Sequence, residues 1–201
     1  MKVGILGGTF DPVHLGHLII ADEARCRFDL GKVIFIPAGQ PWMKADRSIA
    51  PAEHRMAMIR LAIASNPYFD VSDIELDRTG PTYTVDTLEH LWKELGYTSL
   101  MYLLVGWDSL CDMPKWKAPL RISKMATLVA FPRPGYEKPD ISGLESSIPG
   151  ISSRLVMLDE PFIGISSTGI RQRAATGRSI RYLVPETVAQ YVVNNNLYRI
   201  T

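Results

Sequence analysis

Residues 7–17 of this chain read Gly7-Gly8-Thr9-Phe10-Asp11-Pro12-Val13-His14-Leu15-Gly16-His17, directly after the short run Lys2-Val3-Gly4-Ile5-Leu6. The run predicts a strand, and Leu18-Ile19-Ile20 after the motif predicts a helix. A glycine-rich turn between a strand and a helix attracts anions, because backbone N–H groups and the positive end of the helix dipole both face it. His14 and His17 add side-chain donors at the same place. The stretch therefore predicts a site for a triphosphate and for chemistry on it.

The bulk composition limits the class of protein. The chain has 201 residues, of which 46% are hydrophobic, and a formal net charge of +1. This length suits a single α/β domain over residues 1–201, with a helical C-terminal subdomain from about residue 167. The near-neutral charge argues against a nucleic-acid partner, and no apolar run approaches the roughly twenty residues of a membrane span.

The cysteines and the N-terminus indicate a cellular location. Cys26 and Cys111 are far apart, and we expect them to be buried or inert thiols rather than a disulfide. The first residues form a strand rather than a charged leader with an apolar core. We therefore expect a cytoplasmic protein. Its assembly state, including a homo-oligomer, stays open.

Apolar runs of strand length alternate with helical periodicity along the chain. This alternation predicts an α/β fold with a doubly wound (Rossmann-like) parallel sheet, helices on both faces and a small C-terminal helical segment. The expected strands are Val3–Leu6, Val33–Ile36, Phe69–Ser72, Leu100–Val105, Thr127–Phe131 and Leu155–Leu158. The expected helices begin near residues 15, 51 and 85, and two more lie at Thr168–Ala175 and Pro185–Asn195. Arg133–Gly150 is rich in Pro, Gly and Ser and is expected to be a mobile surface loop.

Familiar phosphate motifs do not account for residues 7–17. The chain has no GxxxxGK[ST], and its glycines do not fit GxGxxG, which weakens a nicotinamide dehydrogenase hypothesis. If a helix begins near Leu15, His14 and His17 lie on the same side of its first turn. Gly16 would then let a ligand approach the helix closely. A metal site made by the two histidines with Asp11 is an alternative, but it leaves the glycine-rich turn unexplained.

The first motif resembles the GxFDPxHxGH signature of the nucleotidyltransferase superfamily, whose HxGH element also occurs in class I aminoacyl-tRNA synthetases. A second stretch, Ile165-Ser166-Ser167-Thr168-Gly169-Ile170-Arg171, resembles the ISSTxIR element of that superfamily. Its hydroxyl groups suit helix caps and phosphate donors, and Arg171 adds a forked cation. Taken alone, the second stretch is typical of an ordinary capped surface helix. Together with the first motif, it predicts a second side of one triphosphate site.

The middle of the chain narrows the resemblance to bacterial nicotinate-nucleotide adenylyltransferases. The matching segments run in order over nearly the whole chain. They are Pro81-Thr82-Tyr83-Thr84-Val85-Asp86-Thr87-Leu88, Gly106-Trp107-Asp108-Ser109-Leu110, Pro114-Lys115-Trp116 and Phe131-Pro132-Arg133-Pro134-Gly135-Tyr136, followed by Leu183-Val184-Pro185 and the ending Leu197-Tyr198-Arg199.

This resemblance implies a reaction. ATP and nicotinate mononucleotide would give deamido-NAD and pyrophosphate, a step of NAD biosynthesis. The substrate phosphate would attack the α-phosphorus of ATP in line, without a protein nucleophile, so catalysis would rest on positioning and charge stabilisation. Mg²⁺ is the expected cofactor, bound mainly through the ATP phosphates rather than by a protein metal site.

The resemblance also implies roles for particular residues. His14, His17 and Arg171 would be catalytic. ATP would contact Gly8, Thr9, Phe10, Asp108, Ser166, Ser167 and Thr168. Nicotinate mononucleotide would contact Lys44, Tyr83, Thr84, Trp116 and Arg133.

Several of these residues have structural alternatives. Trp116 could anchor a loop, Lys44 could be solvated, and Thr84 could cap a helix that begins at Val85. Asp11 is expected to hold the first loop. The remaining candidates, His54, Arg55, Arg60 and His90, are expected to be helix-surface residues.

Two departures from the family pattern concern the mononucleotide pocket. The second loop reads Pro41-Trp42-Met43-Lys44 where Pro-Pro-His-Lys is usual, and Lys117 stands where an aromatic residue often follows the stacking tryptophan. The charge of Lys117 could pair with a carboxylate. Nicotinamide mononucleotide and phosphopantetheine are alternative substrates on the same scaffold. A non-catalytic nucleotide sensor is disfavoured, because both histidines and the arginine are present.

Overall fold

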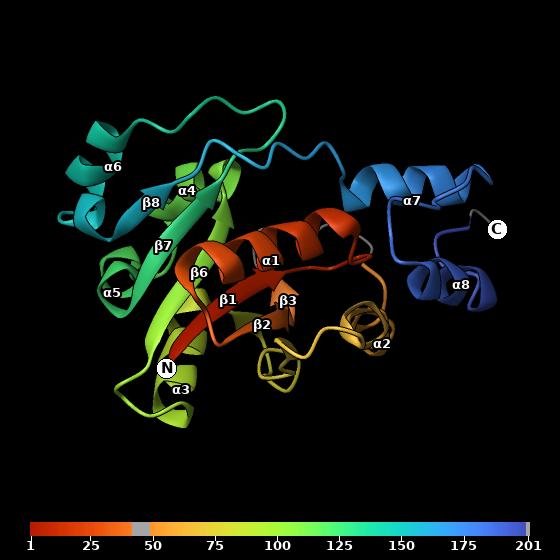
Figure 1. The fold of residues 1–201 in the computed structure, drawn as a ribbon, viewed down its shortest axis with the longest axis horizontal. Coiled ribbons are helices and arrows are strands. Elements are labelled where there is room, and N and C mark those ends of the chain that lie inside the picture. The colour runs from red at the N-terminus through yellow and green to blue at the C-terminus, as the bar shows by residue number, and fades with distance from the viewer. Residues whose placement is uncertain (42–48, 200–201) are drawn as a thin grey trace.

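A six-stranded parallel sheet forms the centre of the protein (Figure 1). We describe it from a computed structural model, for residues 1–41 and 49–199. The strands lie in the order β4-β2-β1-β6-β7-β8, and every neighbouring pair is parallel. Their bounds are β1 Lys2–Gly8, β2 Lys32–Pro37, β4 Phe69–Val71, β6 Leu100–Gly106, β7 Ala126–Phe131 and β8 Leu155–Met157. All six predicted strands are confirmed, with small shifts at their ends.

Helices connect the strands and cover both faces of the sheet, as predicted (Figure 1). They are α1 Leu15–Phe28, α2 Ala52–Ile63, α3 Thr84–Glu94, α4 Trp107–Asp112, α5 Pro119–Met125, α6 Ile141–Ser147, α7 Ser167–Ala175 and α8 Glu186–Asn194, with short 3₁₀ turns at Met113–Lys115 and Ile151–Arg154. Two short strands, β3 Gln40–Pro41 and β5 Pro81–Thr82, pair in a small second sheet that the sequence did not predict.

Successive side chains of a strand point to opposite faces of the sheet, so the strands contribute to two hydrophobic cores. On β2, Val33 and Phe35 pack toward α1, α2 and α8, whereas Ile34 and Ile36 pack toward α3, α4 and α5. Both faces of the strand are therefore buried, which explains its continuous apolar sequence. Each such side chain stabilises the fold by about 1.5–3 kcal/mol relative to an exposed one.

The segment Arg133–Gly150 corrects a prediction. It contains α6, whose first turn is capped by Asp140: the carboxylate accepts the backbone N–H groups of Ser142 and Gly143, each at 3.0 Å. Leu144 and Ile148 are buried in the core beneath it. The prediction of a mobile loop is therefore wrong over these residues, because an N-cap and two apolar anchors outweigh the Pro- and Gly-rich flanks.

Two further features bear on expectations from the sequence. Cys26 and Cys111 are free thiols, as expected, but both are exposed rather than buried. Within residues 1–41 and 49–199, no helix has the length and apolar character that crossing a membrane requires.

The winding of the sheet creates a place for a ligand. From β1 the chain proceeds outward through β2 to β4, and it then returns to the other side of β1 at β6. The connections beyond the carboxyl ends of β1 and β6 therefore lead away from each other. In open α/β sheets, ligands bind in the crevice at this reversal.

Candidate functional site

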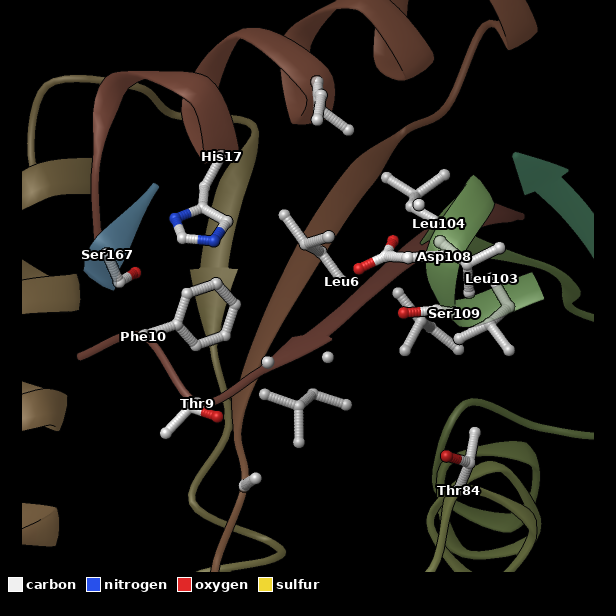
Figure 2. Close-up of a pocket in the computed structure, with 18 of the residues that line it drawn as sticks. Leu6, Thr9, Phe10, His17, Thr84, Leu103, Leu104, Asp108, Ser109 and Ser167 are labelled. Carbon is white, nitrogen blue, oxygen red and sulfur yellow. The ribbon is translucent and has the colours of Figure 1, made fainter. Parts of the chain in front are cut away.

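A cavity of about 430 Å³ opens at the carboxyl ends of β1 and β6 (Figure 2). The predicted site residues that line it are Gly8, Thr9, Phe10, His14, His17, Tyr83, Thr84, Asp108, Trp116, Arg133, Ser166, Ser167, Thr168 and Arg171. Lys44 lies outside the described residues, as do Trp42 and Met43. Figure 2 shows His17 beside Phe10 and Ser167, with Asp108 and Ser109 across the cavity and Thr84 on α3.

The two histidines are organised by the start of α1. The helix begins at Leu15, so both imidazoles fall on one side of its first turn, as predicted. Their rings stack with centroids 3.7 Å apart, and the backbone N–H of His14 donates to Nδ1 of His17 at 3.2 Å. Because Nδ1 of His17 accepts this bond, the neutral ring carries its proton on Nε2. His17 can therefore donate a hydrogen bond through Nε2.

His14 is buried, with 6% of its surface exposed. Burial, and to a smaller extent the nearby charge of Arg133, lower the pKa of His14 to about 4. The ring is therefore neutral at pH 7. Its Nδ1 atom has no hydrogen-bond partner within the described part of the chain.

Gly16 has a packing role in addition to the predicted one. A Cβ at this position would lie 3.0 Å from Nδ1 of His14 and 3.2 Å from Cγ2 of Ile163. The space beside the glycine is thus occupied by protein atoms. The missing side chain therefore makes room for the His14 ring, and Gly16 also lines the cavity, as a close approach of a ligand would require.

The two sequence signatures meet at the first loop. Ser167 Oγ donates to the carbonyl of Pro12 at 2.9 Å, across 155 residues of sequence. Arg171 Nη1 donates to the carbonyl of Asp11 at 2.7 Å, and its Nη2 donates to Thr168 Oγ1 at 3.3 Å. The predicted convergence of the glycine-rich turn and the Ser-Ser-Thr segment on one cavity is confirmed.

The N-termini of α7 and α3 lie beside the cavity. The cap of α7 follows the usual rule, whereas the expected cap of α3 needs a correction. Ser166 caps α7, because its Oγ accepts the N–H of Gly169 at 3.1 Å. Thr84 was a candidate cap for a helix that begins at Val85. The helix α3 instead begins at Thr84 itself, and Tyr83 holds the cap position with an extended backbone. Thr84 therefore lies within the first turn of α3.

Arg55 was predicted to lie on a helix surface, and this prediction is wrong. It is 3% exposed, and its guanidinium donates to the carbonyl of Thr9 at 2.9 Å and to that of Ala50 at 3.1 Å. The sequence held a signal: Arg55 is four residues before Ile59, so it shares the buried face of α2. Arg55 therefore braces the first loop from α2.

Asp11 holds the loop, as expected. Its carboxylate is 2% exposed, and Oδ1 accepts a hydrogen bond of 2.8 Å from the hydroxyl of Tyr198. Oδ2 lies 3.8 Å from Nη1 of Arg171. Burial, followed by the charge of Asp11, raises the pKa of Tyr198, which therefore stays protonated as a donor. Within the described ranges no group of three His, Cys, Asp or Glu side chains could hold a metal ion.

Asp108 and Arg133 face each other just beyond the carboxyl ends of β6 and β7. Arg133 Nη1 lies 3.4 Å from Oδ2 of Asp108, while Oδ1 is buried and has no hydrogen-bond partner in the described part of the protein. A Cβ at Gly106 would collide with this Oδ1. Glycine at the end of β6 therefore allows the carboxylate to fold back over the strand end.

The far end of the cavity lies beside the first turn of α3. Trp116 is partly buried against the core on that face of the sheet, so it also anchors its loop. Lys117 pairs with a carboxylate of the chain itself, since its Nζ lies 2.9 Å from Oδ2 of Asp86. Glu75, Thr87 and Ser109 also line the cavity, although the sequence did not single them out as site residues. Thr87 and Ser109 belong to the motif segments quoted above, whereas Glu75 lies outside them and reaches the cavity only through the fold.

Comparisons with known proteins show the family to which this chain belongs. The cytidylyltransferase-like family matches residues 5–173. A protein of Dehalococcoides mccartyi named "Probable nicotinate-nucleotide adenylyltransferase" is 48% identical over 198 residues, which are 98% of this chain and 97% of that one. A protein of the same name from a Roseiflexus species is 47% identical and covers 98% of each chain. This chain belongs to the nicotinate-nucleotide adenylyltransferase family. The resemblance noted in the sequence is confirmed.

A solved structure shows the same fold. It is the Plasmodium falciparum nicotinic acid mononucleotide adenylyltransferase complexed with NaAD, with a TM-score of 0.78 at 20% identity, over 98% of this chain and 97% of that one. At this identity the likeness concerns the fold. The doubly wound sheet is therefore shared between this member of the nicotinate-nucleotide adenylyltransferase family and a distant relative.

Tyr198→Phe tests whether the C-terminal segment braces the first loop of this family member. The change leaves the buried Oδ1 of Asp11 without its donor, so we expect the free energy of unfolding to fall by about 1–3 kcal/mol in urea titration. Tyr182→Phe is the matched control, because Tyr182 is 86% exposed and should change stability by less than about 0.5 kcal/mol. Equal stability of both variants would contradict the bracing role.

His14 should titrate far below ordinary histidines. NMR of the imidazole across a pH series should give a midpoint near 4. In the unfolded chain the group binds its proton near pH 6.5, so the unfolded state takes up protons first as pH falls. The contribution of His14 to stability is therefore complete above pH 6.5, and it declines toward pH 4 by roughly 3 kcal/mol. A midpoint near 6.5 would contradict the burial of the ring.

Proposed function

We propose that this chain transfers the adenylyl group of ATP to the phosphate of nicotinate mononucleotide, forming deamido-NAD and pyrophosphate in NAD biosynthesis. The observation that carries the proposal is a single cavity lined at one end by His17 and Arg171 and at the other by Thr84 and Trp116. One end suits a triphosphate, and the other suits a pyridine ring with an acidic substituent. Membership of the family supports the same reaction.

ATP would lie with its phosphates against the first loop and α7. The backbone of Gly8, Thr9 and Phe10 would line the nucleotide site, with hydroxyl groups from Ser166, Ser167 and Thr168 on the opposite side. His17 would donate through Nε2, and Arg171 would supply a positive charge. His14 is neutral at pH 7, so it would act as a hydrogen-bonding group rather than as a standing cation.

The transfer needs no covalent intermediate on the protein. An oxygen of the mononucleotide phosphate forms a bond to the α-phosphorus, and the bond from that phosphorus to the oxygen bridging toward the β-phosphate breaks. The electron pair leaves with pyrophosphate. The protein would contribute by aligning the two phosphates and by donating hydrogen bonds to oxygens that gain charge in the transition state.

The residues at the phosphate end are compatible with Mg²⁺ carried by ATP. The carboxylate of Asp11 is occupied by Tyr198 and Arg171, whereas Asp108 keeps one buried oxygen without a protein partner in the described ranges. This donor set suits a cation held mainly by phosphate oxygens and water, with Asp108 nearby. When bound with ATP, Mg²⁺ supplies positive charge to the phosphate oxygens.

Nicotinate mononucleotide would bind at the α3 end. Trp116 would stack on the pyridine ring, and Tyr83 and Thr84 would face the carboxylate from the first turn of α3, where the helix dipole favours negative charge. Arg133 and Lys44 would contact the mononucleotide phosphate. We also propose a cytoplasmic location, since Cys26 and Cys111 are free thiols, as is usual in a reducing compartment.

The assay that tests this function measures pyrophosphate release from ATP and Mg²⁺ with nicotinate mononucleotide, nicotinamide mononucleotide or phosphopantetheine. We expect release with the first substrate to exceed that with the other two. Release only with phosphopantetheine would assign the chain to another activity of the superfamily. ATP binding without release from any substrate would indicate a nucleotide sensor and overturn the proposal.

His17→Ala should lower turnover about a hundredfold, because a donor to the charge developing on the phosphoryl oxygens is lost. Steady-state kinetics of pyrophosphate release measures the effect. His90→Ala is the control, since His90 is exposed on α3, away from the cavity, and its turnover should match that of the unaltered chain. Near-normal turnover of His17→Ala would remove His17 from the catalytic group.

Trp116→Ala should raise the KM for nicotinate mononucleotide about tenfold, the scale of one lost aromatic stacking contact, while the KM for ATP changes little. Initial rates with each substrate varied in turn give both constants. Trp92→Ala provides the comparison, because Trp92 lies outside the cavity. If Trp116→Ala raised both constants equally, the assignment of Trp116 to the pyridine ring would be wrong.

A further inference from the structure

Four charged side chains surround the first turn of α3 in the described part of the chain. Lys117 Nζ lies 2.9 and 3.2 Å from the two carboxylate oxygens of Asp86. Arg78 donates to Thr87 Oγ1 at 3.0 Å, and that hydroxyl donates to Glu75 at 2.8 Å. Two cations therefore stand against two carboxylates at this end of the cavity.

Lys117 lines the cavity, whereas its partner Asp86 is not one of the lining residues. The lysine side chain is half exposed, and Asp86 points at it from the first turn of α3. Its Nζ also lies 4.5 Å from the centroid of the Tyr83 ring, a cation–π distance. The ammonium is thus held in place by an acid and an aromatic ring that both belong to the start of α3.

This arrangement sets the charge that a ligand meets at the pyridine end. With Lys117 present, Asp86 is offset, and the helix N-terminus adds partial positive charge. Without Lys117, the carboxylates of Asp86 and Glu75 would stand against Arg78 alone within this group of four side chains. An acidic ring substituent would then meet net negative charge, while a neutral carboxamide would be unaffected by the change.

We propose that Lys117 is a specificity-determining residue that favours a carboxylate over a carboxamide on the pyridine ring by offsetting Asp86. The inference rests on the proposed function. An aromatic residue at position 117 would carry no charge and could not offset Asp86. Because the Lys117–Asp86 pair is partly exposed, its effect is moderate and is screened by salt.

The test compares nicotinate and nicotinamide mononucleotides as substrates of the full chain. Lys117→Met should lower kcat/KM for the acid roughly three- to fivefold, the scale of one partly exposed charge, and leave kcat/KM for the amide unchanged. Lys117→Arg should retain the preference. The double variant Lys117→Met/Asp86→Asn also lacks the carboxylate of Asp86 that Lys117 would otherwise offset. The preference for the acid over the amide should therefore return in this variant.

Lys115→Met is the matched control. Lys115 also pairs with an aspartate, Asp112 at 2.7 Å, but it is outside the cavity and 71% exposed. It should leave the acid-to-amide ratio unaltered. Because Asp86 is offset in the unaltered chain, raising salt should change its preference little, whereas in Lys117→Met screening of the uncompensated carboxylate should bring the preference for the acid back toward that of the unaltered chain.

Calorimetric titration of both mononucleotides separates this inference from the proposed function. A loss of affinity for the acid alone in Lys117→Met supports the inference. Equal losses for acid and amide, or no loss for either in an active enzyme, would overturn the role of Lys117 and leave the adenylyl transfer standing. No pyrophosphate release and no binding of either mononucleotide by the unaltered chain would overturn both.

Discussion

The site depends on the hydrogen bonds that hold three backbone carbonyl groups of the first loop, those of Thr9, Asp11 and Pro12. Arg55, which lies on α2, donates to one of these carbonyl groups. Ser167 and Arg171, which lie on α7, donate to the other two. With these carbonyls directed into the protein, the loop keeps a defined backbone at the carboxyl end of β1. A loop so braced can present its other face to a ligand without a large ordering cost on binding.

Charge is distributed unevenly along the cavity. At the phosphate end, Arg55, Arg133 and Arg171 stand against the carboxylates of Asp11 and Asp108 among the described residues, while the buried His14 stays neutral. The positive charge thus attracts anions without requiring both stacked imidazoles to be charged. At the α3 end, cations and carboxylates are nearly balanced around the helix N-terminus. The phosphate end therefore suits general attraction of phosphates, and the α3 end suits discrimination between ring substituents.

The strands and most helices could be predicted from the sequence because both faces of a doubly wound sheet are buried, which leaves continuous apolar runs between helical periods. The predictions failed where a local cue was outweighed. The helix α6 was taken for a loop because Pro and Gly flank it, although Asp140 caps it and Leu144 lies in the core. Arg55 was assigned to the surface by residue type, although its spacing from Ile59 placed it on the buried face.

By itself, the sequence determined the class of fold, the two signatures of the phosphate site and the family, because motif spacing and apolar periodicity are local properties of the chain. Only the tertiary structure decided which atoms those signatures use. It directs Arg171 to a backbone carbonyl, fills the space beside Gly16 with the His14 ring, and sets Lys117 against Asp86 across 31 residues of sequence. The reason is that hydrogen-bond partners and burial depend on which segments the folded sheet brings together, and no local pattern encodes that choice.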